Sequence, residues 1–401
     1  PVLMDWATCD APSSRRRARM LLLSRMRMLN LALQGGGSHG AFTWGVLDAL
    51  LEDGRLGFEG LSGTSAGAVN AVALASGWTT AAAAGRDPRE GARDTLAAIW
   101  RGVGDLGSLG ALHQQFARLL WGGLPPELSP ASILGNAWRG LLSPYQSNPL
   151  DINPLRTLLE AEIDFAAIAA QRELKVFVSA TDVETGKAVV FGGARLDARA
   201  VLASACLPLL FQAVEIDGRA FWDGGYSANP ALSPLIKECR TADLLLVQIN
   251  PLARPGTPRT GSDILDRVSE LTFNASLLTQ MRAIALVNRM LGQGAVSHER
   301  CKTVRVHRIE AAPALEPFPA SSRVSADGVM IGKLFEAGRG AAREWLAQHF
   351  DAVGHRATVD IARDYLDDSG LDLPLTATPG MRSVGKGFRG WLARLLRQQS
   401  G

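Results

Sequence analysis

Hydrophobic positions in the first part of the chain alternate between short apolar runs and helical patterns. A run from Leu29 to Leu33 ends in Gln34 and three glycines, and apolar side chains then recur at helical spacing from Ala41 to Leu51. A second unit has the same order, with a run from Phe58 to Leu61, a glycine turn and an alanine-rich helix from about Ala66 to Ser76. Two strand-to-helix turns in succession predict an α/β fold with a mostly parallel sheet that helices cover.

Strand patterns return later in the chain, at residues 174–180, 189–191, 221–223, 244–249 and 303–307. Between about residues 102 and 154 the pattern weakens into Gly, Pro, Trp and Leu, which we interpret as a helical insertion. We therefore predict a flexible basic N-terminal arm at 1–28 and a catalytic domain at 29–310. A helical C-terminal section at 311–401 follows.

Composition indicates a folded protein in water. Hydrophobic residues make up 47% and charged residues 20% of the 401 residues, which excludes a wholly disordered chain and a membrane bundle. The charge-free stretch 60–84 is long enough to span a bilayer, but its many small residues and glycines predict a strand, a turn and a helix instead. The net charge of +3 gives no indication of nucleic-acid binding.

Cysteine and histidine spacing gives no sign of a metal centre. The four cysteines lie far apart, without the pairs of a zinc site or of a secreted disulfide framework. No His-Glu-x-x-His and no calcium-loop spacing occurs. We expect reduced thiols, a cytoplasmic location, no metal and no cofactor.

The segment Gly63-Thr64-Ser65-Ala66-Gly67 fits the pattern G-x-S-x-G, a sharp turn that lifts a serine hydroxyl clear of a sheet. Gly63 and Gly67 allow the close backbone approach that this turn requires, and Ser65 would face the positive end of the following helix. Gly- and Ser-rich turns without function are also common. The pentapeptide alone thus makes Ser65 a candidate nucleophile.

A glycine loop, Gly35-Gly36-Gly37-Ser38-His39-Gly40, precedes the first predicted helix and also fits the dinucleotide pattern G-x-G-x-x-G. A nicotinamide site needs an acidic residue at the end of the second strand, where Ser62 and Gly63 stand, and a Walker loop needs a Gly-Lys-Ser/Thr that is missing. Backbone N–H groups of Gly35, Gly36, Gly37 and Ser38 could instead bind an oxyanion. We favour that role.

A third candidate is Asp223, which follows an apolar stretch and precedes Gly224 and Gly225. A lone Asp-Gly pair is usually only a turn. Its significance comes from its order in the chain, after the glycine loop and the serine turn.

Taken together in this order, the three motifs resemble those of the patatin-like phospholipase family, over about Leu29 to Ile249. The segment from Ala203 to Pro208 is also similar to the one that precedes the family's aspartate. The resemblance implies a three-layer sandwich and a dyad without histidine, in which Ser65 attacks and Asp223 is the base. It departs at His39, where relatives often carry Arg or Lys, so a fixed positive charge beside the oxyanion is in doubt.

This resemblance implies a serine lipid-acyl hydrolase of the phospholipase A or carboxylic esterase type, with a lipid or ester as substrate. Two alternatives remain: an acyltransferase that uses the same serine, and a catalytically inactive lipid- or granule-binding protein. Head group, chain length and oligomeric state are not encoded in any pattern that we can read.

Two segments could bring a lipid to the site. In the insertion, Leu119, Leu120, Trp121, Leu124 and Trp138 could line an acyl channel or could pack as an ordinary subdomain. In the tail 385–401, apolar residues from Phe388 to Leu396 fall on one helical face and arginines on the other, which suits the inner surface of an anionic membrane or packing on a protein surface.

Overall fold

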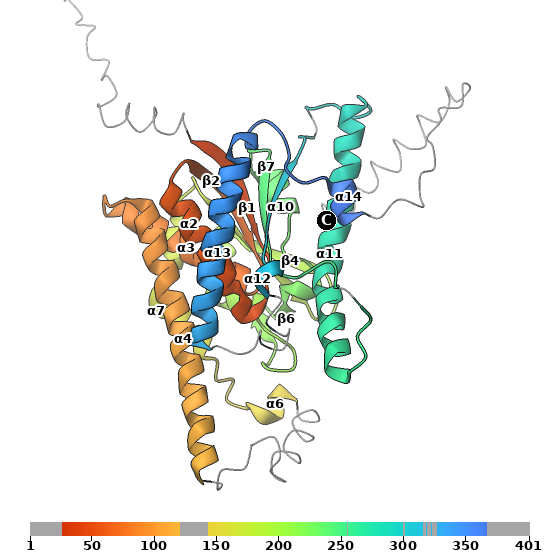
Figure 1. Ribbon diagram of the computed structural model, residues 1–401. Helices are drawn as coiled ribbons and strands as arrows, with labels where there is room; N and C mark the ends of the chain where they lie inside the picture. Colours follow the sequence, from red (N-terminus) through yellow and green to blue (C-terminus); the bar gives the residue numbers. More distant parts are fainter. Residues whose placement is uncertain are drawn as a thin grey trace, which may run out of the picture. The chain divides into compact units, whose positions relative to one another are not determined.

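The computed structural model describes residues 26–120, 143–254, 256–299, 301–315, 318, 322 and 327–366, and those up to Tyr365 belong to one compact unit. Residues 1–25 of the predicted N-terminal arm lie outside the described residues, as do Trp121, Leu124 and Trp138 of the insertion and the tail 385–401. The predicted boundary of the arm at residue 28 is too late, because the first strand, β1, begins at Arg27. Residues 102–120 of the insertion continue a long helix, α4, which spans Pro88–Leu120 (Figure 1).

The core is one sheet in which neighbouring strands follow the order β5-β6-β3-β2-β1-β7-β8, with β4 also paired to β3. Strands β3, β2, β1, β7 and β8 lie next to one another and run parallel. Strands β4, β5 and β6 are antiparallel to their neighbours. Their bounds are β1 Arg27–Leu33, β2 Leu56–Gly63, β3 Lys175–Asp182, β4 Ala188–Gly192, β5 Val214–Ile216, β6 Arg219–Asp223, β7 Asp243–Gln248 and β8 Arg305–Glu310. The predicted mostly parallel sheet is confirmed.

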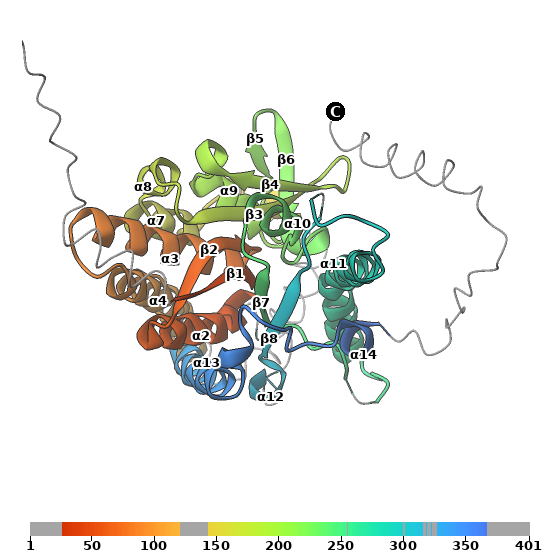
Figure 2. The ribbon, with the colours of Figure 1, turned by 90° about the horizontal axis from the view of Figure 1, so that it is seen from above.

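Helices cover both faces of the sheet, so the unit has three layers, with α2, α3, α4 and α13 on one side and α10 and α11 on the other (Figure 2). The central strands are buried on both faces, which is why β1 and β7 read as continuous apolar runs. The helices are α2 Gly40–Asp53, α3 Ala66–Ala83, α4, α6 Pro144–Ser147, α7 Pro154–Glu162, α8 Phe165–Ala170, α9 Ala198–Ser204, α10 Ser233–Glu238, α11 Gly261–Gly292, α12 Ala312–Leu315, α13 Gly328–His349 and α14 Ile361–Tyr365.

Helix α13 packs closely on α2. A Cβ added to Gly45 of α2 would lie 2.0 Å from the carbonyl oxygen of Phe335, and one added to Gly338 of α13 would lie 2.1 Å from that of Phe42. Glycine on each helix therefore allows the two backbones to approach. Helix α13, within the predicted helical section, is thus part of the same core as the N-terminal half.

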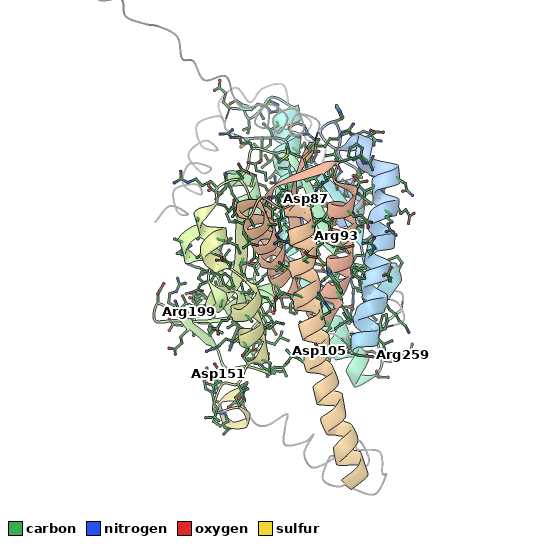
Figure 3. The ribbon with its side chains drawn as sticks, turned by 90° about the vertical axis from the view of Figure 1, so that its left-hand side faces the viewer. Asp87, Arg93, Asp105, Asp151, Arg199 and Arg259 are labelled. Atoms are coloured by element: carbon green, nitrogen blue, oxygen red, sulfur yellow. The ribbon has the colours of Figure 1, made fainter. Side chains whose placement is uncertain are left out.

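Charged side chains join the same helices at the surface of this layer. Arg93 of α4 (Figure 3) donates to Asp48 of α2 at 2.8 Å. Asp48 also pairs with Arg339 of α13. Partly buried pairs of this kind are screened less by salt than exposed ones, so the cluster helps to hold α2, which begins directly after the glycine loop.

The register of β3 determines where β6 ends. Parallel pairing of β3 with β2 stops at Val178, opposite Gly63, and antiparallel pairing with β6 begins at Ala180, opposite Asp223. The last residue of β6 is thereby brought beside the turn that follows β2. That turn contains Ser65.

Candidate active site

Ser65 lies in a tight turn between β2 and α3. Its backbone has φ 54° and ψ −124°, a positive-φ conformation that residues with a side chain rarely adopt. An added Cβ on Gly63 would lie 2.2 Å from the carbonyl oxygen of Gly67, and one on Gly67 would lie 2.1 Å from that of Leu33. Only glycine fits at both positions, so the turn has the geometry that the G-x-S-x-G pattern predicts.

Asp223 is fully buried at the end of β6. Its Oδ1 accepts a 2.7 Å hydrogen bond from the N–H of Gly225, and its own N–H donates to the carbonyl oxygen of Cys206 at 2.7 Å. Its Oδ2 is buried without a partner at hydrogen-bond geometry among the described residues. One carboxylate oxygen is therefore held by the backbone, and the other is available.

Burial raises the pKa of Asp223 to about 7, and hydrogen bonds from Gly225 and from the Ser65 hydroxyl lower it by less. The Ser65 hydroxyl is thus near enough to lower the pKa of the carboxyl group, while Oδ2 has no hydrogen-bond partner among the described residues. Loose contacts of this kind are usual between a nucleophile and its base before substrate binds. Desolvation gives this carboxylate the basicity that an ordinary aspartate lacks at neutral pH.

The glycine loop lies directly against the serine turn. A Cβ on Gly35 would lie 2.8 Å from the Cβ of Ser65, and one on Gly40 would lie 2.6 Å from the Cβ of Ala66. The absence of side chains at these positions lets the loop backbone reach the nucleophile. The structure therefore brings together the three motifs that the sequence separates.

The hydrogen bonds of the loop restrict which of its N–H groups could bind an oxyanion. The N–H of Gly35, predicted as one of the donors, points instead at Oδ1 of Asn229 with a distance of 2.7 Å, so it is not available. No hydrogen bond occupies the N–H groups of Gly36, Gly37 and Ser38 among the described residues. These three remain as candidate donors.

His39 is the residue of the glycine loop at which the sequence departs from the family resemblance. It is 2% exposed, and its Nε2 lies 2.7 Å from the hydroxyl of Ser322. This ring therefore packs within the protein beside the start of α2.

A set of buried hydroxyl groups supports the site and was not predicted from the sequence. Thr64 contacts the Ser179 hydroxyl at 2.5 Å and donates to the carbonyl oxygen of Ala228 at 2.7 Å, while Thr181 donates to the carbonyl oxygen of Asp223 at 2.8 Å. These bonds hold the serine turn, β3 and the aspartate loop together. Their only sequence signal is the occurrence of small polar residues at the ends of strands.

Among the described residues, no group of three or more His, Cys, Asp and Glu side chains could hold a metal ion. Across the same described ranges, every helix is too short or too polar to pass through a bilayer.

Comparison with known proteins gives one family. The sequence model described as patatin-like phospholipase matches residues 31–236, which include the glycine loop, Ser65 and Asp223. No curated protein matches the chain. Among solved structures, VipD from Legionella pneumophila is similar at 14% sequence identity with a TM-score of 0.31, covering 86% of this chain and 73% of that one.

Proposed function

Since this chain belongs to the patatin-like phospholipase family, we propose that it is a serine lipid-acyl hydrolase in which Ser65 and Asp223 cleave fatty acyl esters. Membership supports lipid acyl hydrolysis in general, because the match spans residues 31–236. One observation supports the finer assignment: the hydroxyl of a strained serine influences a buried carboxylate whose pKa burial raises to about 7. A serine and a base within reach of each other are the minimum for nucleophilic catalysis.

In the first half-reaction, Ser65 Oγ attacks the ester carbonyl carbon while Asp223 takes the hydroxyl proton. The tetrahedral intermediate then collapses, the bond to the alcohol breaks, and Asp223 returns the proton to the leaving oxygen. In the second half, a water molecule gives a proton to Asp223 and attacks the acyl-enzyme. The fatty acid leaves as Asp223 returns this proton to Ser65, so one turnover consumes one ester and one water and regenerates the free enzyme.

The negative charge on the tetrahedral intermediate needs hydrogen-bond donors on the opposite side from Asp223. The N–H groups of Gly36, Gly37 and Ser38 are the donors that we assign, because they lie in the loop that packs against Ser65 and have no partner among the described residues. Each such donor typically contributes about 3 to 4 kcal/mol to lowering the barrier.

A fluorophosphonate probe tests the nucleophile directly. We expect wild type to be labelled and Ser65→Ala to be unlabelled. Ser76→Ala is the matched control, because Ser76 is also buried, in helix α3, and its hydroxyl oxygen accepts a hydrogen bond from the Asp164 N–H at 2.9 Å. Absence of labelling on the folded wild type would favour a lipid-binding protein without catalysis.

A lipid panel with product identification tests the reaction. Phospholipids, triacylglycerols and short p-nitrophenyl esters should release free fatty acid, and Asp223→Asn should abolish release while leaving the fold intact. Transfer of the acyl chain to an added alcohol, with little free acid, would identify an acyltransferase instead.

A further inference from the structure

Two asparagine side chains from different loops hold the Gly35 residue on both sides. Asn229 Oδ1 accepts the hydrogen bond from the Gly35 N–H at 2.7 Å, and Asn250 Nδ2 donates to the Gly35 carbonyl oxygen at 2.9 Å. Both asparagines are fully buried. The orientations of the two peptide groups that flank Gly35 are therefore determined by side chains that lie far away in the sequence.

The second of these bonds bears on the oxyanion site. A peptide group is planar and trans, so its carbonyl oxygen and the next N–H point in opposite directions. When Asn250 holds the Gly35 carbonyl oxygen, the N–H of Gly36 must point away from Asn250. We propose that Asn250 is a positioning residue that aims the Gly36 N–H at the oxyanion; this inference rests on the proposed function.

Asn250 is itself held in place by other buried amides. Its N–H donates to Gln34 Oε1 at 2.8 Å, and its carbonyl oxygen accepts from Gln248 Nε2 at 3.1 Å. Gln34 in turn donates to Asn274 of α11 at 3.1 Å. Because both the N–H and the carbonyl oxygen of Asn250 are bonded, its side chain loses little conformational entropy when it bonds to the loop. A preorganised hydrogen-bond donor has this requirement.

The same chain provides a matched control for a purely structural role. Asn30, in β1, is 2% exposed and donates from Nδ2 to the carbonyl oxygen of Thr241 at 2.8 Å. In both Asn30 and Asn250, Oδ1 is buried without a partner among the described residues. The two asparagines therefore make the same type of bond, but only Asn250 bonds to the glycine loop.

The test compares Asn250→Ala and Asn250→Asp with Asn30→Ala and Asn30→Asp, using a short p-nitrophenyl ester. We expect the Asn250 variants to lose roughly 100-fold in kcat with KM changed by less than about threefold, because a misplaced donor acts on the transition state. Their affinity for a trifluoromethyl ketone, which forms a tetrahedral adduct, should fall by a similar factor. The Asn30 variants should keep kcat within about threefold of wild type at a temperature where they are folded.

Equal losses of kcat in the Asn30 and Asn250 variants would overturn this inference and leave the proposed function intact. A folded wild type that neither hydrolyses esters nor reacts with fluorophosphonate would overturn the proposed function, and the inference with it. A crystal structure of phosphonylated wild type provides a test that needs no variant. The phosphonyl oxygen should lie within hydrogen-bond distance of the Gly36 nitrogen, and an oxygen held only by other donors would contradict the assignment.

Discussion

The backbone N–H of Ser65 donates a hydrogen bond to the hydroxyl oxygen of Ser204 with a distance of 2.9 Å. Ser204 is the last residue of α9, and two residues later the carbonyl oxygen of Cys206 accepts the N–H of Asp223 at 2.7 Å. One short segment thus contacts the backbones of both proposed catalytic residues. It is a candidate for fixing the distance between them.

Ser204→Ala should lower both stability and activity. The substitution leaves the Ser65 N–H buried without its partner, which costs about 1 to 3 kcal/mol of unfolding free energy. Because the serine turn is strained, we also expect a loss of kcat. Urea denaturation and ester hydrolysis measure the two effects. As a control, Thr79→Ala removes a hydroxyl that bonds only to its own helix, at the Ala75 carbonyl oxygen 2.7 Å away, and should change neither quantity appreciably.

The pH dependence of hydrolysis should report Asp223. Burial raises the pKa of Asp223 to about 7, and only its ionised form can accept the Ser65 proton. We expect kcat/KM to rise about tenfold per pH unit below neutrality and to level off above the pKa. A profile that is already flat from pH 5 upward would mean that the carboxylate is hydrated in the free enzyme.

Replacing the same residue should also change how stability depends on pH. The folded-state pKa of Asp223 is raised from 3.8 to about 7, so between these values the folded protein keeps a proton that the unfolded chain releases. The contribution of this group to stability is present at acid pH and is lost as pH rises through 7. Asp223→Asn should therefore be more stable than wild type by roughly 2 to 4 kcal/mol at pH 8, and by little at pH 4, in denaturant titrations.

Glycine substitutions should separate tight positions from open ones. Gly67→Ala would place a Cβ 2.1 Å from the Leu33 carbonyl oxygen, and we expect it to unfold the turn or to destabilise the protein by more than about 3 kcal/mol. Gly340→Ala, in helix α13, meets nothing within 4 Å and should stabilise by about 0.5 to 1 kcal/mol. Thermal melts of the two variants should shift in opposite directions.

Alkylation should distinguish the cysteines. Burial raises the pKa of the Cys206 thiol to about 12 and that of Cys239 to about 11. Both should resist iodoacetamide in the folded protein, whereas the half-buried Cys301 should react. Peptide mass spectrometry before and after unfolding measures this. Modification of Cys206 at the rate of Cys301 would show that the segment after α9 opens in solution.

Much of the site could be predicted because glycines and strand ends are visible in the sequence. Gly63, Ser65 and Gly67 lie within five residues of one another, so the pattern predicted the turn, although its contacts with Leu33 and Ser204 come from distant parts of the chain. The family model also matches the stretch that contains Asp223. The mostly parallel sheet could also be predicted, because two successive strand-to-helix turns leave few other topologies.

The rest depends on contacts between distant residues. Gly35 was expected to supply an oxyanion donor, but a side chain 194 positions away, that of Asn229, takes its N–H. Nothing in the glycine pattern indicates which amide will reach the loop. The strand pattern at 221–223 likewise indicated β6 but not its antiparallel direction, because the pairing of Asp223 with Ala180 of β3 is a matter of tertiary register.

The position of β1 between β2 and β7 also constrains how the protein can be made. The ribosome delivers β1 and the serine turn well before it delivers Asp243–Gln248. During that interval the nascent chain presents an apolar strand with one unpaired edge, which is a hazard for association with other chains. A fragment cut at the end of the family match, residue 236, would keep that bare edge permanently, and a recombinant version should accumulate in inclusion bodies.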